Sequence, residues 1–221
     1  MVFLFPKVYP ILDASVIPQT GRAEFLQRLG RALTDSGVSL LEYRNKIGKD
    51  EELLADCATL RAAMPIEHVK LILDDRADLV DQVQFDGVHV DAGDVPPAEA
   101  RRLVGKNRIV GTFGGGEGLV PGVLDEPVDY LAVGPVYLTT TKQTYREPIG
   151  PEGVRRIRGL VGPERILTAA AGITLQTAPA VLAAGANAVA VSAAIFKAHD
   201  PAGEFKRWMA VLGLRGPGRP R

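Results

Sequence analysis

Three charged side chains lie at alternate positions near the second apolar run of the sequence: Glu42, Arg44 and Lys46. In an extended chain, residues at i, i+2 and i+4 point to the same face. Charged groups in a packed interior are costly unless they meet partners or a ligand. The trio therefore predicts a site for a charged ligand if the chain stays extended through Lys46. If the strand ends earlier, the three are solvated loop charges.

Carboxylates follow the next two apolar runs. Asp74 and Asp75 come directly after residues 69–73, and Asp94 follows residues 87–90 across a short turn. If these runs are neighbouring parallel strands, the carboxylates can approach one ion. Magnesium takes one or two protein carboxylates and fills its shell with water and phosphate oxygens. The sequence thus predicts a Mg²⁺ site at Asp75 and Asp94; the alternative for each aspartate is a helix N-cap.

The second half of the chain carries residue types that bind phosphate. Thr139, Thr141 and Lys142 offer hydroxyls and a point charge. Residues 171–174 and 192–194 are expected to open helices, where small residues let backbone N–H groups approach an anion. Tight turns also need small residues, which is the alternative for these two segments.

The elements that must position these residues alternate in type along the chain. Short β-rich runs are separated by helical stretches, as in repeated βα units. The strands are expected over residues 8–12, 40–44, 69–73, 87–90, 108–112, 130–133, 165–168 and 188–191. The helices are expected over residues 22–36, 50–64 (capped by Asp50), 77–83, 96–104, 151–161 and 174–184. Glycine and proline interrupt the stretch between the fifth and sixth strands.

Eight such units in 221 residues favour a single (β/α)8 TIM barrel over an open doubly wound sheet. We expect the barrel to span residues 1–214 and a disordered basic tail without function to span 215–221. In such barrels chemistry lies at the strand ends and the loops that follow them. The candidate residues above occupy those positions.

Composition excludes several other classes of protein. Lys and Arg number 26, as do Asp and Glu, so no global field recruits nucleic acid or an acidic membrane. No run reaches the roughly 18–20 apolar residues of a membrane span, and residues 1–10 do not resemble a signal peptide. One cysteine, Cys57, allows no internal disulfide and fits the cytoplasm. The sequence leaves open whether the chain forms a homo-oligomer.

The histidines and the cysteine give weaker evidence of a functional site. His68, His89 and His199 are scattered and lack the i, i+4 spacing of a metal site. His89 ends a strand and could line the pocket, but we interpret it as a core or loop histidine. No nucleophilic triad signature or dinucleotide-binding fingerprint is present. Cys57 lies in a predicted helix and is expected to be a small buried residue.

Six segments together resemble the thiamine-phosphate synthase family, in order and at the expected spacing. They are residues 43–46, 71–76, 86–89, 129–135, 139–142 and 183–187, and the resemblance spans about residues 5–212. The paired aspartates with the threonine–lysine loop are the more specific part. The glycine-rich turns occur in many phosphate-binding barrels.

The resemblance implies a reaction and roles. Hydroxymethylpyrimidine diphosphate and hydroxyethylthiazole phosphate, both small molecules, would be joined with release of diphosphate. By resemblance Asp75 and Asp94 bind the metal, and Arg44, Lys46 and Lys142 hold the diphosphate and pyrimidine as catalytic residues. The implied substrate-binding residues are Glu42, Asp74, Thr112, Thr139, Thr141, Ala171, Gly172, Val191 and Ser192.

The chain departs from the family pattern at several of these positions. Glu42 replaces a usual glutamine and Asp74 a usual asparagine, so two donors to the aminopyrimidine edge are lost unless a carboxyl is protonated. Thr112 replaces a serine, Ala171 the first glycine of a pair, and Ala193 a hydroxyl residue. We hypothesise that Glu42 and Asp74 still face the pyrimidine, one accepting from its amine, the other pairing with a protonated ring nitrogen or with Arg44.

Three other functions stay open at this point. A synthase-inactive relative such as a thiazole tautomerase would tend to lack the paired aspartates and the threonine–lysine loop. A non-catalytic barrel that binds a phosphorylated metabolite would explain the altered residues as relaxed specificity. A sugar-phosphate isomerase would need an acid/base pair but gives no reason for the threonine–lysine loop.

Overall fold

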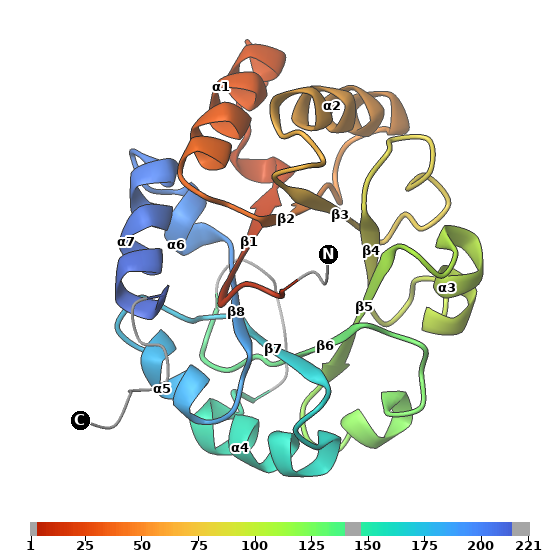
Figure 1. Ribbon diagram of the computed structural model, residues 1–221, viewed down its shortest axis with the longest axis vertical. Coiled ribbons are helices and arrows are strands. Elements are labelled where there is room, and N and C mark those ends of the chain that lie inside the picture. Colours follow the sequence, from red (N-terminus) through yellow and green to blue (C-terminus); the bar gives the residue numbers. More distant parts are fainter. Residues whose placement is uncertain (1–3, 140–146, 214–221) are drawn as a thin grey trace.

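Eight parallel strands close into a barrel in chain order, with helices around it (Figure 1). The computed structural model describes residues 4–139 and 147–213. The strands are β1 (Val8–Asp13), β2 (Leu40–Arg44), β3 (Lys70–Asp74), β4 (Gly87–Val90), β5 (Ile109–Gly115), β6 (Tyr130–Val133), β7 (Ile166–Ala170) and β8 (Ala188–Val191). The α-helices are α1 (Arg22–Asp35), α2 (Asp50–Ala63), α3 (Pro97–Val104), α4 (Gly150–Val161), α5 (Ala178–Ala183), α6 (Ala193–Phe196) and α7 (Pro201–Gly213), and the 3₁₀ helices are η1 (Ala14–Val16) and η2 (Val120–Val123).

Closure is direct, because β1 pairs in parallel with both β2 and β8. Ile11 is in register with Glu42, and Val8 is in register with Val189. The predicted (β/α)8 barrel is therefore confirmed. The predicted tail 215–221 lies outside the described residues.

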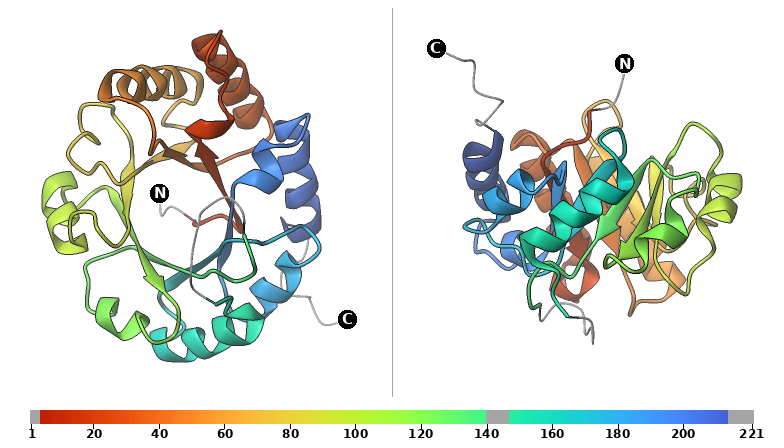
Figure 2. Two further views of the ribbon diagram at one scale, coloured as in Figure 1. Left: turned by 180° about the vertical axis from the view of Figure 1, so that it is seen from behind. Right: turned by 90° about the horizontal axis from the view of Figure 1, so that it is seen from below.

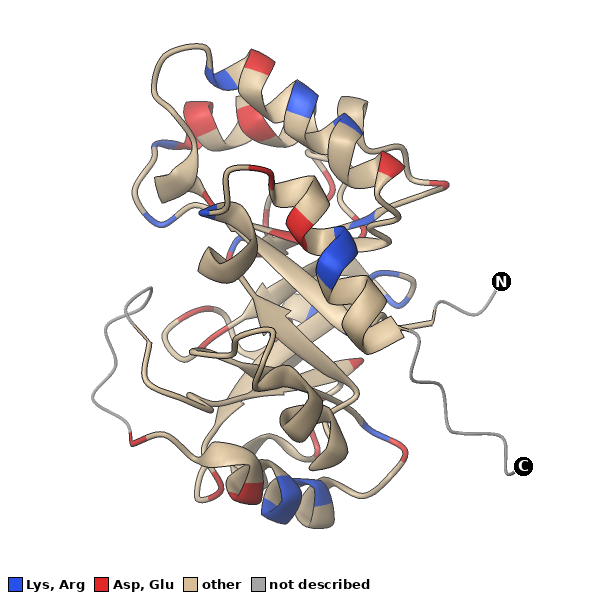
Figure 3. Ribbon diagram, turned by 90° about the vertical axis from the view of Figure 1, so that its left-hand side faces the viewer, with Lys and Arg blue, Asp and Glu red and all other residues tan. Residues whose placement is uncertain are grey.

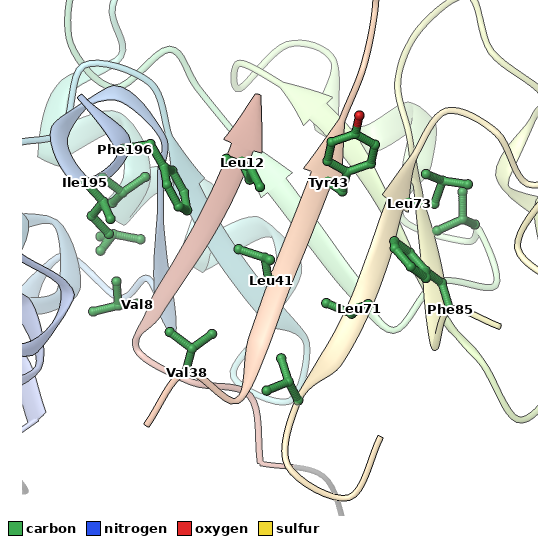
Figure 4. Packing of buried hydrophobic residues seen from close by; sticks show 14 of the residues in the cluster. Val8, Leu12, Val38, Leu41, Tyr43, Leu71, Leu73, Phe85, Ile195 and Phe196 are labelled. Atoms are coloured by element: carbon green, nitrogen blue, oxygen red, sulfur yellow. The ribbon is translucent and has the colours of Figure 1, made fainter. Parts of the chain in front are cut away.

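Side chains alternate between the inside and the outside of the barrel, as strand geometry requires. On β2, Leu41 and Tyr43 belong to the large apolar cluster shared with the helices, whereas Glu42 and Arg44 line an inner cavity. Figure 4 shows Leu41 and Tyr43 beside Leu12, Leu71 and Leu73 in that outer layer. The alternation confirms that Glu42 and Arg44 share one face, and that this face is the interior.

A smaller apolar cluster fills the barrel interior. It contains Tyr9, Leu40, Ile72, Tyr130 and Ala190. The Phe5 ring packs on Tyr9 and Tyr130 from the amino-terminal end, where the chain enters the barrel (Figure 2, right). The interior is thereby packed at the amino ends of the strands, and open space remains at their carboxyl ends.

One predicted helix is wrong, and another begins later than predicted. The stretch 77–83 forms successive hydrogen-bonded turns instead of a helix, and these turns bury Val80 and Val83. The helix expected from 174 begins only at Ala178, because the Thr174 N–H donates to Thr177 Oγ1 at 2.9 Å and closes a turn first. The interrupted stretch after β5 contains the short helix η2.

The expected cap of α2 is also wrong. Asp50 is the first residue of the helix, and its carboxylate accepts from Arg76 at 2.5 Å instead of from the helix backbone. Lys49 occupies the N-cap position. The Asp50–Arg76 pair ties the start of α2 to the segment that follows β3.

The outer surface carries both signs of charge. Figure 3 shows Lys and Arg interspersed with Asp and Glu along the helices and loops of one side. Across residues 4–139 and 147–213, no helix combines the length and apolar character needed to cross a membrane.

Candidate active site

A cavity of about 720 Å³ opens at the carboxyl ends of the strands. Its lining includes residues from β1 to β8 or from the loops that follow them, so it lies where barrels of this type bind ligands. Nine of the predicted catalytic and substrate-binding residues line it: Glu42, Arg44, Lys46, Asp74, Thr139, Ala171, Gly172, Val191 and Ser192. The fold therefore brings residues from β2, β3, β6, β7 and β8 to one space.

Two cationic side chains sit between carboxylates at the β1–β3 side of the cavity. Arg44 is paired with Asp13 through Nη1, and its Nε lies 3.3 Å from Asp74 Oδ2. Lys46 Nζ lies 3.5 Å from the same Asp74 oxygen and is also paired with Asp75. Both cations are partly exposed, so they can also bind a ligand anion. The arrangement suits an anionic group with several oxygens.

The two carboxyls that replace amides of the family pattern are both buried. Glu42 is 3% exposed and Asp74 is 7% exposed. Burial, with the Asp74 charge second, raises the pKa of Glu42 to about 8. Burial likewise raises the pKa of Asp74 to about 6, although Lys46 and Arg44 oppose the shift. A neutral Glu42 carboxyl has one donor and one acceptor, as an amide edge does.

Glu42 is connected by successive hydrogen bonds to Tyr9, Tyr130 and His89. The sequence did not indicate the two tyrosines as site residues, and it indicated His89 as a core or loop histidine. Tyr9 donates to Glu42 Oε2 at 2.6 Å, the Tyr9 and Tyr130 hydroxyls are 2.8 Å apart, and His89 Nδ1 lies 2.9 Å from the Tyr130 hydroxyl. His89 is a buried, hydrogen-bonded histidine as expected, and it also lines the cavity. Alternation along each strand places these residues on the inner face of the barrel, and this alternation was the signal in the sequence that could have identified them.

The candidate metal residues lie beside the cavity lining and not within it. Asp74, Asp91 and Ala92 line the cavity, whereas Asp75 and Asp94 do not. Asp75 has φ 66° and donates its N–H to the His89 carbonyl at 2.8 Å. The Asp94 charge contributes to raising the pKa of Asp74, after burial and against the two cations. The two aspartates thus flank the Asp74 edge of the cavity.

The helix-cap alternative is wrong for both aspartates. Asp94 Oδ2 accepts the Asp91 N–H at 2.7 Å, and the N-cap of α3 is Pro96. No helix directly follows Asp75. The Asp75 Oδ1 atom is buried and has no hydrogen-bond partner among residues 4–139 and 147–213. Neither carboxylate therefore serves a helix end.

The loops after β6 and β7 lie against each other at the opposite side of the cavity. Tyr137 donates its N–H to the Ala171 carbonyl at 3.1 Å. Ala171 and Gly172 both have positive φ, at 72° and 69°, which costs an alanine more than a glycine. A Cβ on Gly172 would overlap the backbone of Tyr137 and Leu138. Gly172 is therefore required for this contact.

The remaining predicted phosphate residues have different placements. Ser192 stands just before α6, and its buried Oγ has no hydrogen-bond partner in the part of the chain that the structure describes. Thr112 does not line the cavity; its hydroxyl donates to the Val90 carbonyl at 3.0 Å, between β4 and β5. Thr141 and Lys142 lie outside the described residues. The helix expected to open at 171–174 starts later, so Gly172 lies in a loop.

A different network holds the loop that carries Lys46. Arg22 donates to Asp56 through two nitrogens, at 2.8 Å and 2.6 Å, and Asp56 accepts from Tyr43. Asn45 donates to the Tyr43 hydroxyl at 3.2 Å and accepts the Gly48 N–H at 2.7 Å. The outward side of β2 thus anchors the turn that follows Arg44.

Comparisons with known proteins agree with this geometry. Residues 8–195 match the family model described as thiamine monophosphate synthase. A thiamine-phosphate synthase of Koribacter versatilis is 35% identical over 94% of this chain and 96% of its own length. One of Agrobacterium fabrum is 35% identical over 88% of this chain and 90% of its own. The solved thiamine phosphate pyrophosphorylase of Pyrococcus furiosus has a TM-score of 0.79 at 25% identity and covers 94% of this chain and 95% of its own.

Proposed function

Because the chain belongs to the thiamine monophosphate synthase family, we propose that it joins hydroxymethylpyrimidine diphosphate to hydroxyethylthiazole phosphate and releases diphosphate. The chain is thus a transferase of thiamine biosynthesis. Its substrates are two small phosphorylated molecules. The buried, unpaired Cys57 supports action in the cytoplasm.

The main support for the proposed site is the position of two cationic side chains in the cavity. Arg44 and Lys46 stand beside the buried Glu42 carboxyl in the same cavity that the loops after β7 and β8 close from the other side. A diphosphate placed against the two cations would leave its carbon–oxygen bond near Glu42 and the cavity centre. The cations stabilise the negative charge that grows on the departing diphosphate. The thiazole nitrogen then attacks the pyrimidine methylene carbon that the diphosphate has left.

Glu42 and Asp74 are the proposed readers of the aminopyrimidine edge. In its neutral form Glu42 can donate to a ring nitrogen and accept from an exocyclic amine, as the amide of the family pattern would. The raised pKa of Glu42 supports that form near neutral pH. Asp74, held by Arg44 and Lys46, offers an acceptor to the amine. The two carboxyls can thus replace the two amides.

The thiazole phosphate is assigned to the opposite side of the cavity. Thr139, the loop at Ala171 and Gly172, and the backbone at Val191 and Ser192 line it there. The Ser192 hydroxyl, which has no partner among the described residues, supports an oxygen-rich ligand at this place. Thr141 and Lys142 complete the proposed site by resemblance. Thr112 has no ligand-facing role in this arrangement.

Magnesium is part of the proposal through Asp75 and Asp94. The Asp75 Oδ1 atom, which lacks a hydrogen-bond partner within the described ranges, and the carboxylate of Asp94 are hard oxygen donors of the kind that Mg²⁺ prefers. Within the described ranges, no group of three or more His, Cys, Asp or Glu side chains is placed to share an ion. An ion held here would need only one or two protein carboxylates. When bound, Mg²⁺ supplies positive charge to the diphosphate oxygens.

The test is formation of thiamine phosphate from the two substrates, with and without Mg²⁺. The proposal expects product with Mg²⁺ and its loss on chelation. Product formed equally well without divalent cations would remove the metal from the proposal. Tight binding of either substrate with no product would favour the metabolite-binding barrel, and isomerisation of the thiazole alone would favour the tautomerase.

A further inference from the structure

Four polar side chains form a continuous line across the barrel interior. They are His89 on β4, Tyr130 on β6, Tyr9 on β1 and Glu42 on β2, joined by contacts of 2.9, 2.8 and 2.6 Å. Each is at most 8% exposed. Three of the four, all but Tyr130, line the cavity. The line therefore spans the cavity floor from β4 to β2.

Packing holds the two phenols in place. The Tyr9 and Tyr130 rings meet edge to face at 5.7 Å, and the His89 ring stacks on Tyr130 at 5.6 Å. Phe5 packs on both tyrosines from the amino-terminal end. Gly111 gives Tyr130 its space, because a Cβ there would overlap the ring and its hydroxyl. The hydroxyls thus have few alternative positions.

The number of protons on the two tyrosines limits the directions in which the hydrogen bonds of this line can run. Each phenol has one proton and must accept from one neighbour while it donates to the other. Burial, with the Glu42 charge second, raises the pKa of both tyrosines, so both remain protonated. The whole line must therefore donate in one direction, toward Glu42 or toward His89.

The two directions differ in what Glu42 offers to a ligand. Donation toward His89 requires a proton on Glu42 Oε2, so it exists only for the neutral acid and leaves Oε1 as an acceptor. Donation toward Glu42 is compatible with both the neutral and the ionised carboxyl. In that direction the acid proton lies on Oε1, because Oε2 already accepts from Tyr9. Glu42 is then a donor toward the cavity.

We infer that Tyr9, Tyr130 and His89 are positioning residues whose hydrogen bonds run from His89 Nδ1–H to Glu42 Oε2, so that Glu42 Oε1 faces the bound pyrimidine as a donor. This inference rests on the proposed function only in taking the ligand to be the pyrimidine. A ring nitrogen without a proton is the acceptor that such a donor selects. A pyrimidine protonated at that nitrogen would be disfavoured.

The direction of the line can be measured without any substrate. Nitrogen-15 NMR of the full chain reports which ring nitrogen of His89 carries a proton. The inference expects Nδ1 to be protonated in the wild-type protein. It also expects Tyr130→Phe, which removes the acceptor, to change the Nδ1 signal. A wild-type His89 with a bare Nδ1 would overturn the inference, because the line would then run the other way.

Binding measurements test the consequence for Glu42. Tyr9→Phe is expected to lower the affinity for hydroxymethylpyrimidine diphosphate about tenfold, as for one lost hydrogen bond, and Tyr130→Phe is expected to lower it less. Both should leave the affinity for thiazole phosphate unchanged. Trp208→Phe is the matched control, because Trp208 is equally buried and its indole hydrogen bond, to Glu204 on α7, lies away from the cavity. Equal losses in all three variants, or a loss for both ligands, would reduce the tyrosines to a structural role.

Failure of the proposed function would look different. A wild-type chain that binds no pyrimidine diphosphate contradicts the proposed substrate, and the His89 measurement still decides the direction of the line. A wild-type chain that binds it, with unaltered affinity in Tyr9→Phe, contradicts the inference alone.

Discussion

Replacing Glu42 with glutamine should change how stability depends on pH. Glu42 is 3% exposed, and burial raises its pKa from 4.5 to about 8. A raised carboxyl pKa favours the folded state at low pH, because the folded chain binds a proton that the unfolded chain releases. This contribution is complete below about pH 4.5 and is lost as the pH rises toward 8. The stability of the wild-type chain should therefore fall across that window through this residue.

The size of the effect follows from the shift. Each pKa unit corresponds to about 1.4 kcal/mol, so the loss between pH 6 and pH 7.5 is roughly 2 kcal/mol. Glutamine keeps an acceptor for Tyr9 and cannot ionise. Glu42→Gln should thus gain roughly 2 kcal/mol over the wild type between these two pH values.

Urea unfolding at several pH values measures this difference. Glu24→Gln, on the exposed side of α1, removes one carboxyl away from the cavity and controls for the change of net charge. Parallel pH curves for the wild type and Glu42→Gln would refute the reasoning, because they would mean that Glu42 ionises alike in the folded and unfolded chains.

Further substitutions have distinct expected outcomes. Gly172→Ala should lower the free energy of unfolding by about 2 kcal/mol, because the positive φ of Gly172 and its contact with the Tyr137 backbone both oppose a Cβ. The same substitution should weaken the binding of thiazole phosphate. Calorimetry of unfolding and of binding measures the two effects. Asp56→Asn should cost about 3 kcal/mol in urea unfolding, because Arg22 loses its buried partner; an unchanged midpoint would contradict this. Lys46→Met should raise the KM for the pyrimidine diphosphate about tenfold or more in steady-state assays and leave that for thiazole phosphate unchanged, since Lys46 lines the cavity at the proposed diphosphate side.

Strand parity explains why much of the barrel could be predicted. Apolar runs bounded by turns located all eight strands, and the alternation on β2 correctly put Glu42 and Arg44 on one face. Short segments were harder. Residues 77–83 bury Val80 and Val83 through turns, and the Thr174–Thr177 hydrogen bonds delay α5. Such local side-chain bonds compete with a helix in ways that periodicity does not reveal.

The candidate site was only partly accessible to sequence reasoning. Charged residues at strand ends stand out, because charge is rare in an apolar run. Tyr9 and Tyr130 do not, because a tyrosine in an apolar run is equally consistent with plain core packing. Their role depends on a contact between β1 and β6, strands far apart in the sequence, which only closure of the barrel creates. Thr112, predicted as a substrate-binding residue, donates its hydroxyl to the Val90 carbonyl, a contact between β4 and β5 that the sequence does not reveal.

The most direct test of the central claim is a crystal structure of the chain with hydroxymethylpyrimidine diphosphate and Mg²⁺. We predict that the pyrimidine ring lies against Glu42 at the cavity floor, with the diphosphate beside Arg44 and Lys46. A diphosphate bound away from these two cations, or a ring that does not contact Glu42, would contradict it.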